Sequence, residues 1–164
     1  MKIKVITSYK PGCWNQYAKK GIESMAEQFP KEIDLVVYAE EPKPECKYDR
    51  IKWIDLNSAE PELTAFKQRH KDDPVAHGKL QTKENGVRRV PELQQLGGAD
   101  KNKESFLWNA VRFSNKVFCV VNGLRNSDGY DYVVWIDADT FSFRSVPIEF
   151  FVSLLPKDTM VTYL

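Results

Sequence analysis

Residues 132 to 140 read Tyr-Val-Val-Trp-Ile-Asp-Ala-Asp-Thr, an apolar run that ends in two carboxylates. The run from Tyr132 to Ile136 is short, continuous and rich in β-branched and aromatic residues, which is typical of a strand buried on both faces of a parallel sheet. Because side chains alternate along a strand, Asp137 and Asp139 should leave its end in the same direction, with the small Ala138 between them. The stretch therefore predicts an α/β fold in which a buried strand delivers two carboxylates to one edge of the sheet.

Two carboxylates held this close repel each other unless a divalent cation or a hydrogen-bonded hydroxyl stabilises their charge. The ordinary interpretation of an Asp-x-Asp sequence is a solvated turn, since Asp is favoured in turns. The apolar run before Asp137 favours a ligand site instead, because buried parallel strands end at the ligand crevice of an open sheet.

Composition limits the classes of protein to consider. The chain has 164 residues, which suits one core, and we predict a single domain over residues 1–164. Its 24 basic and 23 acidic residues give a formal net charge of +1, which argues against binding to nucleic acid. No signal-peptide pattern and no apolar run of about 18 residues is present, so no membrane span is expected. The three cysteines, Cys13, Cys46 and Cys119, lack metal-ligand spacing, and their odd number favours reduced thiols and a cytoplasmic location.

The N-terminal part of the chain has the pattern of a β-strand, a helix and a second β-strand. Residues 2 to 9 and 33 to 39 are mostly apolar and β-branched, which predicts strands. Between them, residues 14 to 29 carry apolar side chains at helical spacing until Pro30 ends the helix. Residues 51 to 56 predict a short third strand. A connection of this kind between parallel strands is expected to be right-handed.

The remaining elements are less regular. A helix is predicted around residues 62 to 70, and residues 71 to 103, broken by prolines and glycines, predict a mobile insertion over the site. His70 and His77 are interpreted as solvated loop histidines, because nothing in the sequence fixes their geometry. Further elements are predicted as helices at residues 104 to 121 and 148 to 155, and as a strand at residues 159 to 164.

Arg112 and Lys116 lie four residues apart in one of these predicted helices and should be neighbours on its surface. From the helix alone, a solvated pair of cations and a pair that binds an anion are equally good interpretations.

Four stretches, in order along the chain, resemble glycosyltransferases of the GT-A fold, a Rossmann-like fold that binds nucleotide-sugars with a divalent metal. The stretches are Thr7-Ser8-Tyr9, Leu35-Val-Val-Tyr-Ala-Glu40, Arg112-Phe-Ser-Asn-Lys-Val-Phe118 and Trp135-Ile-Asp-Ala-Asp-Thr140. The resemblance covers nearly the whole chain except residues 71 to 103. It implies a mostly parallel sheet with helices on both faces.

The resemblance also implies a role for the carboxylates. Asp139 would bind Mn²⁺ or Mg²⁺ directly, and Asp137 would reach the ribose or the metal through a water molecule. The Asp137-Ala138-Asp139 turn would lie against the nucleotide, and its metal would neutralise the diphosphate and stabilise the leaving nucleotide.

Further residues would bind the nucleotide-sugar. In that family the loop Thr7-Ser8-Tyr9 would hold the base and ribose, with Tyr9 as a stacking candidate. Glu40 or Tyr38 could contact the base edge. Arg112 and Lys116 become candidates for the phosphates or the sugar, since cations beside a diphosphate give charge-assisted hydrogen bonds.

The sequence departs from that family at its C-terminal end. Complete members continue into an acceptor-binding half, which often supplies another metal ligand, commonly His, and a catalytic base. This sequence ends at Leu164 with neither. The expectation is therefore a donor-binding half, whose unidentified acceptor site would come from a second copy of the chain or from a partner chain.

The predicted function is metal-dependent binding of a nucleotide-sugar, with a UDP-sugar as first choice, and glycosyl transfer or slow hydrolysis of the donor. A nucleotide-sugar-binding module without transferase activity is the main alternative. Haloacid-dehalogenase-like phosphatases also end a buried strand in Asp-x-Asp, but Thr140 is one position too early for that family. Too few residues follow Asp139 to supply its other motifs.

Overall fold

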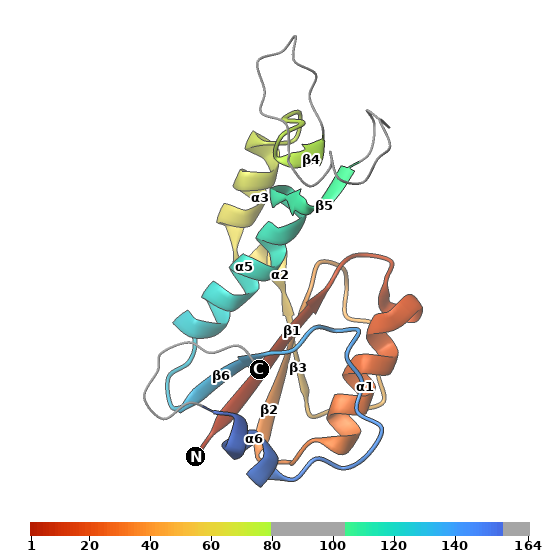
Figure 1. The fold of residues 1–164 in the computed structure, drawn as a ribbon, viewed down its shortest axis with the longest axis vertical. Coiled ribbons are helices and arrows are strands. Elements are labelled where there is room, and N and C mark those ends of the chain that lie inside the picture. The colour runs from red at the N-terminus through yellow and green to blue at the C-terminus, as the bar shows by residue number, and fades with distance from the viewer. Residues whose placement is uncertain (80–103, 156–164) are drawn as a thin grey trace. The chain divides into compact units, whose positions relative to one another are not determined.

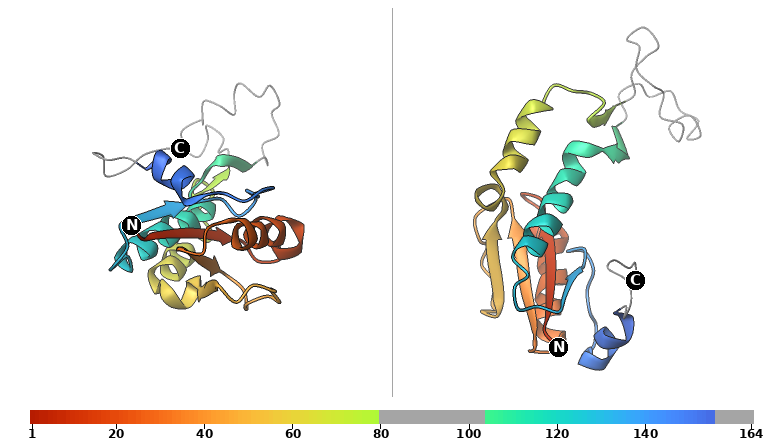
Figure 2. Two further views of the ribbon diagram at one scale, coloured as in Figure 1. Left: turned by 90° about the horizontal axis from the view of Figure 1, so that it is seen from below. Right: turned by 90° about the vertical axis from the view of Figure 1, so that its left-hand side faces the viewer.

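The structure, a computed structural model, describes residues 1–79 and 104–155. The chain divides into two compact units, whose elements are drawn in Figures 1 and 2. The first unit consists of Met1–Ala59 and Cys119–Leu164, and the second consists of Glu60–Phe118. The sequence predicted one domain with an insertion, and residues 80–103 of that insertion lie outside the described residues. The predicted strand at residues 159 to 164 lies outside them as well.

A four-stranded parallel sheet with the order β3-β2-β1-β6 forms the centre of the first unit. Its strands are β1 (Ile3–Tyr9), β2 (Ile33–Ala39), β3 (Ile51–Asp55) and β6 (Tyr132–Trp135). β1 and β2 pair along their full lengths, from Ile3 opposite Ile33 to Tyr9 opposite Ala39, so both strands end at the same edge. The predicted α/β class with a parallel sheet flanked by helices is confirmed.

One face of this sheet is covered by the helix that follows β1. After β1 the chain forms a π-helical turn (Trp14–Ala18) and continues directly as α1 (Lys19–Gln28). A second helix, α6 (Ile148–Leu154), contributes Phe151 to the same core. The buried side chains include Val5, Ile22, Met25, Ile33, Leu35, Val37 and Phe29. Each such side chain contributes about 1.5–3 kcal/mol by leaving water, which explains why α1 packs here.

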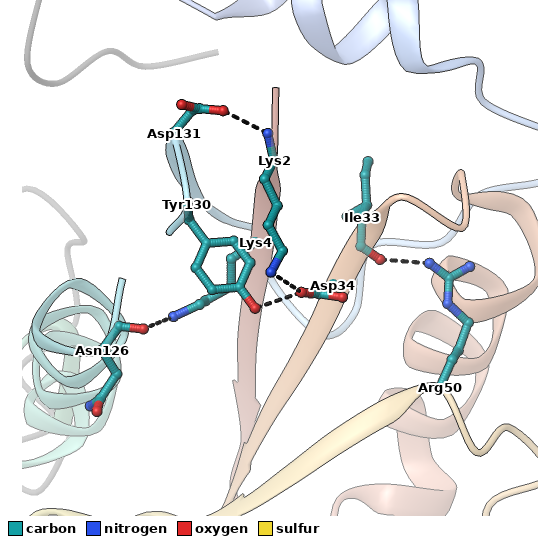
Figure 3. Close-up of polar contacts among 8 residues, drawn as sticks. All are labelled: Lys2, Lys4, Ile33, Asp34, Arg50, Asn126, Tyr130 and Asp131. Atoms are coloured by element: carbon teal, nitrogen blue, oxygen red, sulfur yellow. Dashed lines mark hydrogen bonds and ion pairs between the residues drawn. The ribbon is translucent and has the colours of Figure 1, made fainter. Parts of the chain in front are cut away.

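Arg50 holds the C-terminal end of α1. The last carbonyl groups of a helix have no partner within the helix and need external donors. The Arg50 guanidinium supplies them, because it donates to four carbonyl oxygens at distances from 2.6 to 3.2 Å. These acceptors belong to Ala26, Phe29, Pro30 and Ile33, and Figure 3 shows the last of these bonds.

The other face of the sheet carries a buried lysine. Lys4 is 4% exposed, and its ammonium donates to the carbonyl oxygens of Gly123, at 3.3 Å, and Asn126. Both acceptors lie at the C-terminal end of α5 (Ala110–Arg125), where the helix dipole is negative. The ammonium also lies 4.4 Å from the ring centroid of Tyr130. Figure 3 shows the two side chains next to each other. Burial lowers the pKa of Lys4, and the nearby Lys52 lowers it further.

β6 differs from its prediction. Only Val134 is buried in this strand, whereas Tyr132, Val133 and Trp135 are partly exposed. Within the described residues β6 pairs with β1 alone and forms an edge of the sheet. The prediction of a strand buried on both faces is therefore wrong here, since an apolar run can also form an edge strand.

The second unit contains α3 (Pro61–Arg69), β4 (His77–Lys79), β5 (Glu104–Asn109) and the start of α5, while the short α2 (Leu56–Ala59) still belongs to the first. A helix was predicted at residues 104 to 121, and this prediction is wrong for Glu104–Asn109. These residues form β5, which pairs antiparallel with β4. The helix begins after Asn109, whose side-chain oxygen accepts the Arg112 backbone N–H at 2.8 Å. Asn is a favoured N-cap residue, and this bond fixes the change from strand to helix.

Both histidines form short-range contacts in the second unit. His70 Nδ1 lies 3.3 Å from the Asp73 carboxylate, and His77 Nε2 lies 3.1 Å from the Lys71 carbonyl oxygen. In the described part of the chain, no helix combines the length and the apolar character that crossing a membrane requires.

Candidate functional site

The order of the strands identifies one position at the carboxyl edge of the sheet. β2 and β3 extend the sheet on one side of β1, whereas β6 joins it on the other side. The strand order therefore reverses between β1 and β6. In open α/β sheets, ligands bind outside the carboxyl ends of the strands at such a reversal. The chain segments at this position are the loop after Tyr9 and the turn after Trp135.

The two predicted carboxylates lie on that turn. The Thr140 N–H donates to the Asp137 carbonyl oxygen at 3.0 Å, which closes a tight turn over residues 137 to 140. Ala138 is 3% exposed, whereas Asp137 and Asp139 are both exposed. The pair thus lies on a turn rather than on a continuing strand, and the small residue between the two aspartates faces inward.

α1 holds this turn through a glycine. A Cβ atom at Gly21 would lie 2.0 Å from the carbonyl oxygen of Ala138 and 2.7 Å from that of Thr140. The chain then follows α1, as Figure 1 shows, and the Ser142 N–H donates to the Ser24 hydroxyl at 2.9 Å. Gly21 was not among the site residues predicted from the sequence. A glycine inside a helix costs about 1 kcal/mol relative to alanine, and that cost is the signal that could have revealed it.

Neighbouring side chains fix the surroundings of the carboxylates. The Trp135 indole N–H donates to Asp137 Oδ1 at 2.7 Å, which orients this carboxylate. Burial raises the pKa of Tyr17 at the start of the helix, and the nearby Cys13 and Asp139 raise it further. Asp139 therefore lies close to the beginning of the helix that follows β1.

Two carboxylates can bind a metal ion whose other ligands come from a substrate. Among residues 1–79 and 104–155, no group of three or more His, Cys, Asp or Glu side chains is arranged to hold a metal. Mg²⁺ and similar ions often bind through one or two carboxylates together with the phosphates of a substrate. The exposed pair Asp137 and Asp139 has this character, whereas a metal cage made only of protein ligands would need more side chains.

The predicted base-binding loop is largely buried. Thr7 is 3% exposed and Tyr9 is 2% exposed, while Ser8 is partly exposed. The Tyr9 ring packs against Trp14 and Trp53, with ring centroids 5.7 and 6.5 Å apart. Tyr9 faces α1 because the odd-numbered residues of β1 do so, and its ring is not available for stacking on a base in this conformation.

Tyr38 and Glu40 have different positions at the end of β2. Tyr38 is 1% exposed, and its hydroxyl donates to the side-chain oxygen of Asn122 at 2.9 Å on the face that carries Lys4. The predicted contact with a base edge therefore falls to Glu40, which is partly exposed. Glu40 lines a cavity of about 420 Å³ together with Ala39, Glu41, Pro42, Lys43, Trp53, Asp55 and Asn57.

Arg112 and Lys116 belong to the second unit, in the first turns of α5, whereas the two carboxylates belong to the first unit. Their predicted role at the phosphates stays a prediction.

No family model, curated protein or solved structure matches the chain.

Proposed function

We propose that this chain binds a nucleotide-sugar together with a divalent metal ion, in the manner of GT-A glycosyltransferases, with a UDP-sugar as the first choice. One observation carries the proposal: the Asp137-Ala138-Asp139 turn lies beside the reversal of strand order, with both carboxylates exposed. A ligand site is expected at that position for reasons of topology, which are independent of the sequence resemblance.

Asp139 and Asp137 would hold Mn²⁺ or Mg²⁺, and the ion would neutralise the diphosphate of the donor. The chain's own residues support this arrangement. The Trp135 indole orients Asp137, and the close contact with Gly21 fixes the backbone between the two carboxylates. A fixed pair of ligands loses less conformational entropy on binding a metal than two freely rotating side chains would lose.

The nucleoside would lie toward the cavity at the ends of β2 and β3. Glu40 and Asp55 offer carboxylate oxygens there to N–H groups of a base or to ribose hydroxyls. Trp53 adds an aromatic wall. Tyr9, buried behind this wall, would support Trp53 rather than stack on the base.

The proposed reaction is glycosyl transfer to an acceptor, or slow hydrolysis of the donor. A binding module without transferase activity would share the metal-dependent binding, and turnover separates the two candidates. The test is a panel of nucleotide-sugars with and without Mn²⁺, followed by assays of sugar release with and without acceptors. Metal-dependent stabilisation is expected for at least one donor, and its absence across the panel would contradict the proposal.

A further inference from the structure

A carboxylate accepts a hydrogen bond from a backbone N–H group beside the proposed site. The Gly12 N–H donates to Glu41 Oε2 at 2.8 Å. Gly12 lies in the loop that leads from β1 into the first helix, and Glu41 lies in the loop after β2. Because β1 and β2 are neighbours, this hydrogen bond joins two loops at the carboxyl edge of the sheet.

A second donor lies close to the same carboxylate. Tyr9 is 2% exposed, and its buried hydroxyl forms no hydrogen bond within the described part of the chain. Burial raises the pKa of Tyr9, and the nearby Glu41 carboxylate raises it further. A buried hydroxyl without an acceptor is unusual in folded proteins and often marks a position where a ligand or water completes the contacts.

The loop has open space beside Gly12. Gly12 has a φ of +74°, a conformation that side chains other than glycine rarely adopt. Apart from Gly12 and its two neighbours in sequence, no atom of the described residues lies within 4 Å of the position that a Cβ of Gly12 would take. Glu41 itself is partly exposed, so its carboxylate can leave without disturbing the core.

We propose that Glu41 is a built-in anionic plug: its carboxylate accepts the Gly12 N–H beside the buried Tyr9 hydroxyl, and a phosphate group of a ligand must displace it to bind both donors. A backbone amide and a neighbouring hydroxyl form the kind of donor set that binds phosphate oxygens. The phosphate class rests on the proposed function, since a nucleotide-sugar carries a diphosphate. The contact between Glu41 and Gly12 is thus autoinhibitory and lowers the affinity for anionic ligands.

Electrostatics favour this role over a purely structural one. Glu41 lines the same cavity as Glu40 and Asp55, with Lys43 as the cation among the lining residues. An anionic ligand approaching this edge meets repulsion from these carboxylates, to which Glu41 contributes directly. Removing the charge of Glu41 therefore removes both a competitor for the donors and a source of repulsion.

The experiment measures binding of inorganic pyrophosphate, without metal, by calorimetry. The proteins are the wild type, Glu41→Gln, Glu41→Ala and the control Glu45→Gln, which changes an exposed carboxylate on the same loop. The Glu41 variants should bind pyrophosphate about tenfold more tightly than the wild type, the change expected when one competing charge-assisted hydrogen bond is lost. Glu45→Gln should match the wild type. Three results would overturn the proposal. Glu41→Gln could bind pyrophosphate with the same affinity as the wild type, Glu41→Gln and Glu45→Gln could gain affinity equally, or neither Glu41 variant could bind pyrophosphate.

A second measurement locates the anion. In amide NMR spectra of Glu41→Gln, pyrophosphate should shift the Gly12 resonance at concentrations about tenfold lower than in the wild type. Binding that leaves the Gly12 resonance unchanged would place the anion elsewhere and would also overturn the proposal.

These measurements separate a failure of the plug from a failure of the proposed function. In one outcome, wild-type protein fails to bind any nucleotide-sugar with Mn²⁺ while the Glu41 variants bind pyrophosphate through Gly12. In that case the plug is supported and the proposed binding of nucleotide-sugars is contradicted. If nucleotide binding depends on metal but is equal in wild type and Glu41→Gln, the proposed binding of nucleotide-sugars is supported and the plug is contradicted.

Discussion

Gly21 on α1 contacts the backbone of Ala138 so closely that any Cβ atom at position 21 would lie 2.0 Å from the Ala138 carbonyl oxygen. This contact links the helix that follows β1 to the turn that follows β6. It connects both chain segments at the reversal of strand order, and it does so between the two candidate metal ligands. The position of the carboxylates therefore depends on a residue that has no functional group.

Gly21→Ala should destabilise the protein by about 1–3 kcal/mol, the usual cost of overpacking, although alanine favours a helix more than glycine does. Backbone atoms form the obstacle, so the turn must move away from α1. Urea denaturation measures the change, and Lys19→Ala on the exposed face of the same helix is the control. Metal-dependent nucleotide binding should weaken as well. A variant as stable as the wild type would show that the turn is not held by this contact.

Much of the sheet could be predicted from sequence because its signals are local. β2 has the predicted bounds, since the apolar run of residues 33 to 39 is limited by Pro30 before it and by Glu40 and Glu41 after it. The helix before Pro30 was predicted for the same reason. The α/β class followed from these elements in sequence.

Features that depend on distant partners were not predictable. Glu104–Asn109 was predicted as helix, but it pairs with β4, and a three-residue partner strand gives almost no signal of its own. Tyr9 and Tyr38 lie at or near the ends of neighbouring strands in comparable sequence contexts, and both are buried by distant residues. Tyr9 packs against Trp14 and Trp53, whereas the Tyr38 hydroxyl donates to Asn122. The need for glycine at position 21 comes from the backbone of Ala138, which is distant in sequence, so it could not be predicted from the helix alone.

Tyr130→Phe should reduce stability by about 1 kcal/mol at pH 7, because the Tyr130 hydroxyl donates to the Asp34 carboxylate at 2.5 Å. That hydrogen bond is the main cause that raises the pKa of Tyr130 to about 12, from a usual value of 10.0. The stability advantage of the wild type is complete below pH 10 and should decline as the pH rises toward 12, since the unfolded chain ionises first. Denaturation of both proteins at pH 7, 9 and 11 measures the difference. A difference that stays constant with pH would contradict this account.

Arg112→Ala and Lys116→Ala test the predicted phosphate contacts. If these cations meet the diphosphate, each substitution should weaken UDP binding by about three- to tenfold and leave uridine binding unchanged, because only UDP carries the charges that they neutralise. Arg125→Ala, at the other end of the same helix, is the comparison variant. Equal losses for UDP and uridine would place both residues away from the phosphates.

Asp139→Asn should abolish the metal-dependent part of nucleotide binding and leave the fold intact. The side chain is exposed and the amide has nearly the same size, so packing does not change, and repulsion with Asp137 is relieved. In the wild type, UDP at about 100 times its Kd with Mn²⁺ should stabilise the protein by about 2.7 kcal/mol, visible in thermal unfolding, and EDTA should remove the effect. Asp139→Asn with UDP and Mn²⁺ should behave as the wild type does in EDTA, whereas the exposed control Asp49→Asn should retain the full stabilisation. A variant that unfolds would identify Asp139 as structural, and one that keeps its metal response would assign the metal to other residues.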